Sequence, residues 1–244
     1  MKKKYFRFMV IFIFFIGLMV GFFYGHYSYK DEMEKVIKGN DDKNSLVLNN
    51  ESNTTNKIEL LQDEFDNSDI KAILTIDNSS FEEVVVQTTD NKYYLNHDYK
   101  KNYDKLGAIY VDYRINLDNS HKTLIYGHSS TKRDVPFNYL ENYEKEDFYQ
   151  NHKYITLQTQ NDTYKYEIFS VYVETSDFTY MNLNFDTKDD WYLHLLKLKR
   201  KSLHESDIEL MKDDDILILQ TCSTNPKYKK YSKKYLLIVS RRVK

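Results

Sequence analysis

A series of short segments that begins near residue 70 limits the fold more than any other part of the sequence. These segments are rich in Val, Ile, Leu, Tyr and Thr and alternate between apolar and polar residues, a pattern typical of strands with one buried face. Eight such segments occur, at 72–76, 83–88, 108–113, 122–126, 154–159, 163–174, 216–221 and 235–241. Because eight strands suffice to close a barrel, the pattern predicts a mainly-β fold.

Helical spacing of apolar residues interrupts this pattern in three places. It predicts an amphipathic helix over 59–69, packed on the outside of the strands. It also predicts helical insertions over 136–148 and 189–202, within an otherwise all-β frame.

The N-terminal region predicts a membrane anchor. Residues 8–25 form an uncharged, mostly apolar run of 18 residues, which as a helix spans about 27 Å, close to the hydrocarbon thickness of a bilayer. Four basic residues precede this run, and such a cluster stays on the cytoplasmic side. We therefore expect a single-pass protein of the cell membrane, with a cytoplasmic N-terminus and an extracellular remainder. A cleaved signal peptide is the alternative, but the run is longer than usual for one and no clear cleavage site follows.

Composition divides the chain into three parts. Residues 1–30 hold the cytoplasmic tip and the predicted transmembrane helix. Residues 31–58 are rich in Asn, Asp, Lys and Ser with little apolar periodicity, and we interpret them as an extracellular stalk or linker. Residues 59–244 contain all the strand-like segments and have a suitable length for one domain.

The charge balance argues against nucleic-acid binding. The 244 residues carry 35 Lys and Arg against 37 Asp and Glu, a formal net charge of −2. Beyond residue 30 the balance is more acidic, at −7, which disfavours binding to a phosphate backbone. The 23 tyrosines could supply stacking platforms, but most occupy alternate strand positions, so we interpret them as barrel surface and core.

The one cysteine and one of the seven histidines stand at comparable places. Cys222 ends the apolar segment 217–222, and His128 follows the apolar segment 123–127. A thiol and an imidazole at two strand ends suit acyl transfer, because a thiolate is the nucleophile and an imidazole moves the proton. A lone cysteine is also often a buried core residue, so spacing alone leaves both interpretations open. One cysteine excludes an internal disulfide, and no Cys/His cluster offers ligands for structural zinc.

Several motifs surround these two residues. The two central motifs are Tyr126-Gly127-His128 and the strand that ends in Thr221-Cys222. Further segments of the same set lie at 90–95, 111–114 and 137–140, with Phe148. Together they resemble the sortases, the membrane-anchored cysteine transpeptidases of Gram-positive bacteria, and class B most closely. The similarity runs from about residue 70 to the C-terminus, and the insertion at 176–212 is also similar to class B.

The resemblance implies an eight-stranded sortase-type β-barrel with an N-terminal helix and a helix inserted between strands six and seven. It implies that Cys222 attacks the threonine carbonyl of an NPxTx-type sorting signal to form a thioacyl enzyme, with His128 as general acid and base. It implies neither a cofactor nor a metal. The expected partners are secreted proteins with a C-terminal sorting signal and a cell-wall amine, from a peptidoglycan precursor or cross-bridge, or a pilin lysine.

Further site residues follow from the same resemblance. The residues expected at the substrate groove are Tyr94, Asn96, Tyr126, Thr221 and Ser223. The backbone N–H of Ser223 is a candidate donor to the oxyanion, since it follows the nucleophile. We also expect Asp112 and Arg114, two residues apart, to form a structural ion pair beneath the site.

The sequence departs from the family at the third catalytic position. Sortases carry an arginine at the start of the strand after the cysteine, and alignment of 235–241 with that strand puts Tyr235 there. Three explanations compete: the Tyr235 hydroxyl donates the hydrogen bond, Lys233 or Lys234 moves in, or activity is weak. A phenol without full charge should stabilise an oxyanion less than a guanidinium does. We favour Tyr235, and the departure motivates a second hypothesis, a catalytically weak or inactive sortase-like protein that binds a partner at the cell surface.

Overall fold

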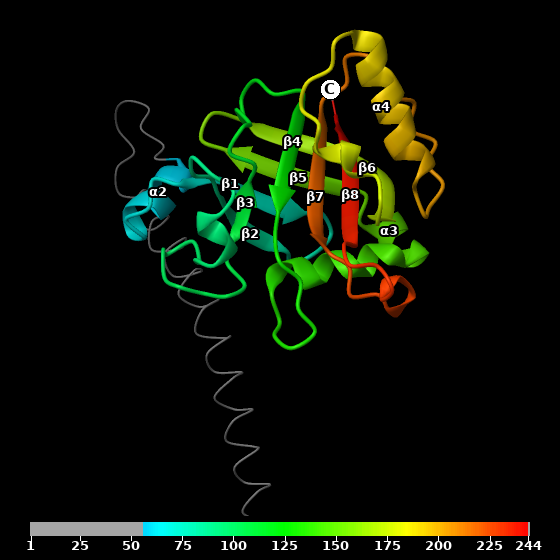
Figure 1. Cartoon of the computed structure of the whole chain (residues 1–244). Coiled ribbons are helices and arrows are strands. Elements are labelled where there is room, and N and C mark those ends of the chain that lie inside the picture. The colour runs from blue at the N-terminus through cyan, green and yellow to red at the C-terminus, as the bar shows by residue number, and fades with distance from the viewer. Residues whose placement is uncertain (1–55, 244) are drawn as a thin grey trace, which may run out of the picture. The chain divides into compact units, whose positions relative to one another are not determined.

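All eight predicted strands are present, and hydrogen bonds join them into one closed barrel (Figure 1). The structure is a computed structural model and describes residues 56–243. The strands are β1 (Ile70–Ile76), β2 (Glu82–Val86), β3 (Ile109–Val111), β4 (Lys122–Tyr126), β5 (Tyr154–Thr159), β6 (Thr163–Glu174), β7 (Ile216–Cys222) and β8 (Tyr235–Arg242). The prediction of an eight-stranded barrel is therefore confirmed, with strand ends that differ by at most a few residues.

The strand order brings β4, β7 and β8 side by side. Around the barrel the order is β1-β2-β3-β4-β7-β8-β6-β5. Strands β4 and β7 run parallel, and Tyr126 lies opposite Gln220. Because parallel strands end at the same edge of a sheet, the residues that follow β4 and those that end β7 meet there. Strand β8 is antiparallel to β7 and begins at that edge, with Tyr235 opposite Cys222.

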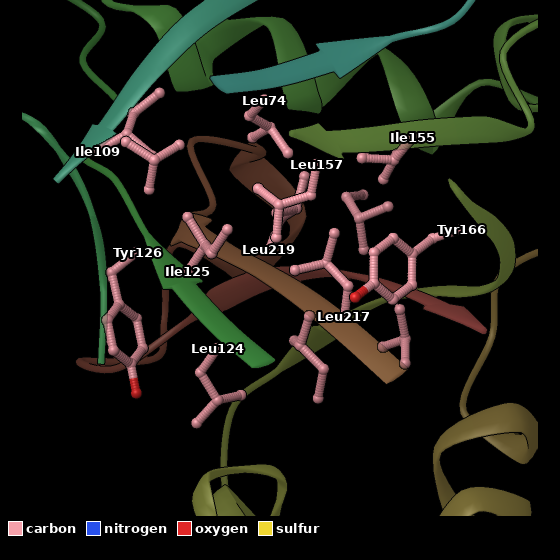
Figure 2. Close-up of a cluster of buried hydrophobic side chains, with 14 of the residues drawn as sticks. Leu74, Ile109, Leu124, Ile125, Tyr126, Ile155, Leu157, Tyr166, Leu217 and Leu219 are labelled. Carbon is pink, nitrogen blue, oxygen red and sulfur yellow. The ribbon is translucent and has the colours of Figure 1, made fainter. Parts of the chain in front are cut away.

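Alternation along β7 divides its side chains between the barrel interior and the outer face. Leu217 and Leu219 are fully buried and gather with Leu74 and Leu157 inside the barrel (Figure 2). Since successive residues of a strand point to opposite faces, Cys222 lies on the outer face. The nucleophile candidate is thus held by a packed strand yet faces away from the core.

The helices differ from the predictions mainly in their ends. Helix α2 (Lys57–Glu64) is shorter than predicted, and the Asn56 side chain accepts a hydrogen bond from the Ile58 N–H at its start. The insertion between β6 and β7 contains the 3-10 helix η3 (Phe178–Met181) and helix α4 (Lys188–Arg200), which confirms the predicted helix there. Two further 3-10 turns are η1 (Tyr93–Leu95) and η4 (Pro226–Tyr228).

The prediction of one helix over 136–148 is wrong. The chain forms a 3-10 helix, η2 (Pro136–Glu144), and then a separate helix α3 (Glu146–Asn151), with an extended residue between them. Buried His204 contacts the Tyr143 carbonyl through Nε2 at 2.6 Å and the Glu146 carboxylate through Nδ1 at 2.5 Å. This side chain from a distant segment satisfies groups on both sides of the break, which local spacing could not reveal.

The predicted transmembrane segment and nearly all of the predicted stalk lie outside the described residues. Within residues 56–243, no helix combines the length and apolar character needed to cross a bilayer.

Candidate active site

Three predicted catalytic residues meet at the barrel edge where β4 and β7 end and β8 begins. The Gly127 N–H donates to the Gln220 carbonyl at 3.1 Å, so the pairing of β4 with β7 continues past Tyr126. This register brings His128 level with Cys222, and alternation puts both on the outer face. Tyr235 lies opposite Cys222 on β8, which places its side chain on the same face.

Close packing explains the glycine before His128. A Cβ atom on Gly127 would lie 2.5 Å from Cδ2 of Phe137, a fully buried ring from η2. No larger residue fits unless the ring moves, because such a separation is far inside van der Waals contact. The middle residue of the Tyr126-Gly127-His128 motif is therefore required by the packing of η2 beneath it.

Two contacts fix the position of His128. Its Nε2 lies 3.1 Å from the Leu95 carbonyl oxygen at the end of η1. Since a carbonyl oxygen only accepts, Nε2 is an N–H donor, and Nδ1 is left to exchange a proton. The hydroxyl of Ser129 donates to the carbonyl oxygen of Cys222, which ties the chain after His128 to the end of β7. Sequence reasoning missed Leu95, since a backbone carbonyl has no sequence signature.

The side chain of Asn138 braces the loop that follows His128. Its Oδ1 accepts from the Ser130 N–H at 2.8 Å, and its Nδ2 donates to the carbonyls of Ser130 at 3.0 Å and Arg133 at 3.2 Å. One amide from η2 thus satisfies three backbone groups of this loop. The loop's conformation is set by η2 rather than by the loop's own residues.

An ion pair that the sequence did not suggest lies near His128. The Arg133 guanidinium donates to both oxygens of Asp104 at 2.6 Å. Desolvation alone would raise the pKa of Asp104, but hydrogen bonds from the Leu106 N–H and Arg133, together with the charge of His128, hold that pKa below its usual value. Asp104 therefore stays ionised and presents negative charge to the imidazole.

The environment of Cys222 favours the neutral thiol. The residue is exposed, yet the surrounding protein raises the pKa of the thiol by desolvation, and the positive charge of Lys234 opposes this rise. A thiol in this state needs a base to become a nucleophile, and the imidazole of His128 lies at the same edge.

The position of the family's arginine holds a neutral hydrogen-bond donor. Desolvation and the nearby Cys222 raise the pKa of Tyr235, so its hydroxyl keeps its proton. Its ring packs edge-on against Phe178 of η3, with centroids 5.9 Å apart. The ammonium of Lys233 lies 5.5 Å from the centroid of the same Phe178 ring, whereas Lys234 is the lysine whose charge acts on Cys222.

Two of the predicted substrate contacts need correction at the nucleophile strand. Thr221 is 1% exposed and points into the barrel with Leu219, so it cannot touch a substrate on the outer face. Ser223 is also buried, and its N–H donates to the Lys234 carbonyl at 2.9 Å. That N–H already takes part in the pairing of β7 with β8, so it is not free to donate a hydrogen bond to an oxyanion.

Two tyrosines predicted at the groove are supports instead. Tyr94 is 2% exposed, and its hydroxyl donates to Asp69 at 3.0 Å, so it anchors η1 from within. Tyr126 is buried, and its hydroxyl donates to Asp112 at 2.9 Å. Asn96 is exposed beside η1, and its contact with substrate stays a prediction.

The predicted ion pair between Asp112 and Arg114 is confirmed. Nε and Nη2 of Arg114 donate to the two carboxylate oxygens of Asp112, each at 2.8 Å. Both residues lie in the turn after β3, because the strand ends at Val111. With the Tyr126 hydroxyl on the same carboxylate, this pair supports the motif that carries His128.

Within residues 56–243, no group of three or more His, Cys, Asp or Glu side chains is arranged to hold a metal ion.

A closed β-barrel with a cysteine and a histidine at the ends of adjacent parallel strands is the arrangement expected of a cysteine transpeptidase. Residues 74–242 match the family model described as "Sortase domain". The chain is 34% identical to Sortase B of Listeria monocytogenes over 165 residues, 67% of each protein. It is 33% identical to Sortase B of Staphylococcus aureus over 157 residues, 64% of each.

A solved structure agrees with these sequence relatives. The "Staphylococcus aureus sortase B-substrate complex" has a TM-score of 0.68 and 30% identity, covering 77% of this chain and 84% of that one. The alignments span about two thirds of the length of the two curated relatives. The chain belongs to the sortase family of cysteine transpeptidases, in its sortase B class.

Proposed function

We propose that this chain cleaves an NPxTx-type sorting signal and transfers the cleaved protein to an amine of the cell wall through a thioacyl intermediate on Cys222. The observation that carries the proposal is the register of three strands, which brings His128, Cys222 and Tyr235 to one barrel edge on one face. The substrates are secreted proteins with a C-terminal sorting signal, and the acceptor is a peptidoglycan precursor, a cross-bridge amine or a pilin lysine. The protein works from a single N-terminal membrane anchor, with the barrel outside the cell.

The first half-reaction forms the thioester. Nδ1 of His128 takes the proton of the Cys222 thiol as Sγ attacks the threonine carbonyl of the signal. The C–N bond after threonine then breaks, and the imidazolium returns the proton to the leaving amine. His128 suits this role because the Leu95 carbonyl binds its Nε2.

The second half-reaction releases the product. The acceptor amine attacks the thioester carbonyl, an amide bond forms, and the C–S bond breaks to regenerate the thiol. His128 accepts the proton that the attacking amine loses and returns one to the departing sulfur. Water in place of the amine would give hydrolysis by the same steps.

The hydroxyl of Tyr235 stabilises the oxyanion in both halves. Tyr235 pairs with Cys222 in the register of β7 and β8, and its hydroxyl keeps its proton. Lys234 contributes positive charge at the thiol, whereas the ammonium of Lys233 stacks over Phe178. We therefore assign the arginine's hydrogen-bond role to Tyr235 and part of its charge to Lys234.

Turnover of a quenched fluorescent peptide that contains NPQTN tests this assignment, with the complete chain in detergent micelles. Cys222→Ala should abolish cleavage. Tyr235→Phe should lower kcat about ten- to a hundredfold with little change in KM, because it removes a donor used only in the transition state. Tyr231→Phe, at an exposed tyrosine of the loop that precedes β8, is the matched control and should retain activity.

Two outcomes would contradict the assignment. If Tyr235→Phe cleaves as fast as the parent chain, the phenol has no role at the oxyanion. If the parent chain cleaves neither this peptide nor related signals, the alternative of a catalytically weak or inactive surface-binding protein becomes the better account.

A further inference from the structure

A cavity of about 590 Å³ lies away from the active-site edge. Its lining includes Lys122, the first residue of β4, whereas His128 lies two residues beyond Tyr126, the last residue of that strand. The insertion between β6 and β7 forms much of its wall, from Leu183 to Trp191. Its volume lies within the range of small-molecule sites, and none of the steps proposed for peptide transfer uses it.

The cavity borders a buried cation that lacks a carboxylate partner. Lys122 is 3% exposed, and its ammonium donates to the Asn182 carbonyl and to Nε2 of His194, each at 2.8 Å. Burial and the charge of Lys122 lower the pKa of His194 to about 3, so this imidazole is neutral and accepts the hydrogen bond. Among residues 56–243, no ion pair joins Lys122 to an acid, and the positive charge of Arg114 acts on it as well as burial.

The other basic residues that line the cavity are either paired with a carboxylate or exposed to solvent. Arg114 and Lys212 each form an ion pair with a carboxylate, and Nδ1 of His121 lies 2.6 Å from a carboxylate oxygen of Asp215. Lys188 is exposed to solvent, which stabilises its charge. Lys122 is therefore the one buried cation of this lining for which an added anion would supply the missing counter-charge.

Aromatic rings give the cavity an apolar side. The rings of Phe185 and Trp191 meet edge to face, with centroids 5.0 Å apart. The ammonium of Lys122 lies 5.5 Å from the centroid of Phe185. A flat apolar group could pack along these rings while its charged end reaches the ammonium.

Acidic residues restrict the charge of an occupant. Asp186 and Asp213 also line the cavity, and both are exposed to solvent at its rim. They would repel a ligand that carries several negative charges along its length. A single carboxylate that reaches Lys122 at the floor avoids this repulsion.

We propose that this cavity binds a small organic monoanion, a carboxylate on a flat apolar body, whose charge pairs with the ammonium of Lys122. The site is separate from the nucleophile edge and does not depend on the peptide that the enzyme cleaves.

Fluorescence of Trp191, the only tryptophan of the chain, provides the test. Benzoate is the probe and benzamide its neutral control, titrated into the complete chain in detergent micelles at pH 6. Burial lowers the pKa of Lys122 to about 7, so its ammonium is charged at this pH. Benzoate should change the emission in a saturable way, and benzamide should not.

Three variants make the test specific. Lys122→Met keeps an apolar stem but removes the charge, and it should weaken benzoate binding about ten- to a hundredfold, as expected for a charged hydrogen bond. Asn184→Glu puts a competing carboxylate on an exposed lining residue and should weaken binding while Lys122 stays in place, which keeps the proposal testable if Lys122→Met fails to fold. Lys105→Met, at an exposed residue outside the lining, should bind benzoate like the parent chain.

Three results would each overturn the proposal. The first is the absence of a saturable change with benzoate. The second is an equal response to benzamide, which would show that binding does not depend on the negative charge of benzoate. The third is unchanged benzoate affinity in Asn184→Glu, or in a folded Lys122→Met, which would place any binding elsewhere.

Discussion

The charge state of Cys222 decides how the nucleophile is activated. Desolvation raises the pKa of its thiol and Lys234 lowers it, with desolvation the larger effect. We therefore predict that alkylation of Cys222 by iodoacetamide is slower at pH 7 than that of a free cysteine, and that its pH midpoint lies above the ordinary value of about 8.5.

The role of Lys234 follows from the same balance. Lys234→Met should move the alkylation midpoint further upward, because the cation that favours the thiolate is lost. Lys229→Met, in the same loop, should leave the midpoint unchanged. A midpoint below that of free cysteine in the parent chain would show that the thiolate is formed in advance, against our account.

Gly127 is a position where a single methyl group should matter. Gly127→Ala brings a Cβ atom to 2.5 Å from the Phe137 ring, so we expect a loss of about 1–3 kcal/mol in the free energy of unfolding. Urea denaturation measures this loss, and peptide turnover should fall as well because His128 is the next residue. The double variant Gly127→Ala with Phe137→Leu should recover part of the stability lost by Gly127→Ala relative to Phe137→Leu alone. A loss in the double variant equal to the sum of the two single losses would contradict the packing argument.

At the level of elements, η2 holds the loop that presents the histidine. Asn138 makes three hydrogen bonds to that loop, so Asn138→Ala should lower kcat/KM about tenfold or more by loosening the position of His128. Asn142→Ala is the matched control, since that amide donates to the Tyr139 carbonyl within the same helix. Equal activity of the two variants, measured by peptide turnover, would contradict the bracing role.

Predictability from sequence differed between strands and helices. All eight strands were predicted because alternation is a local signal, and β4, β5 and β6 match to the residue. The break between η2 and α3 was missed because His204, about sixty residues away, satisfies the groups on both sides of it. Tertiary hydrogen bonds of this kind produce no periodic pattern in the local sequence, so they cannot be predicted from it.

In the active site too, residues that belong to sequence motifs were predicted, whereas contacts between distant segments were not. His128, Cys222 and Tyr235 were named from motifs and alignment, and the register then placed them on one edge. Thr221 was placed in the groove although strand alternation from buried Leu219 puts it inside the barrel. The Leu95 carbonyl could not be found from sequence, because it contributes a backbone atom that any residue carries.

For the molecule as a whole, two buried bases make stability depend on pH. Burial lowers the pKa of Lys122 to about 7 and that of His194 to about 3. Each base binds its proton more readily in the unfolded chain, so acidification favours unfolding. Lys122 lowers the stability of the folded chain as the pH decreases from about 10.5 to 7. His194 does so as the pH decreases from about 6.5 to 3.

Urea denaturation of Lys122→Met tests this dependence. The parent chain should gain stability from pH 7 to pH 10 relative to the variant, by on the order of 2 kcal/mol. Lys105→Met, at an exposed lysine, should follow the parent. If the parent and Lys122→Met change in parallel over this range, the ammonium of Lys122 is not destabilised by burial.

In the mechanism that we propose, Cys222 forms a thioester with the sorting signal, and intact-protein mass spectrometry detects this intermediate. The complete chain is mixed with an NPQTN peptide without an acceptor amine, and the reaction is quenched in acid. The mass of the intact protein is then measured. We predict an added mass equal to the peptide up to its threonine, lost on treatment with hydroxylamine and absent in Cys222→Ala. Cleavage of the peptide without such an adduct by both the parent chain and Cys222→Ala would contradict a mechanism that depends on this cysteine.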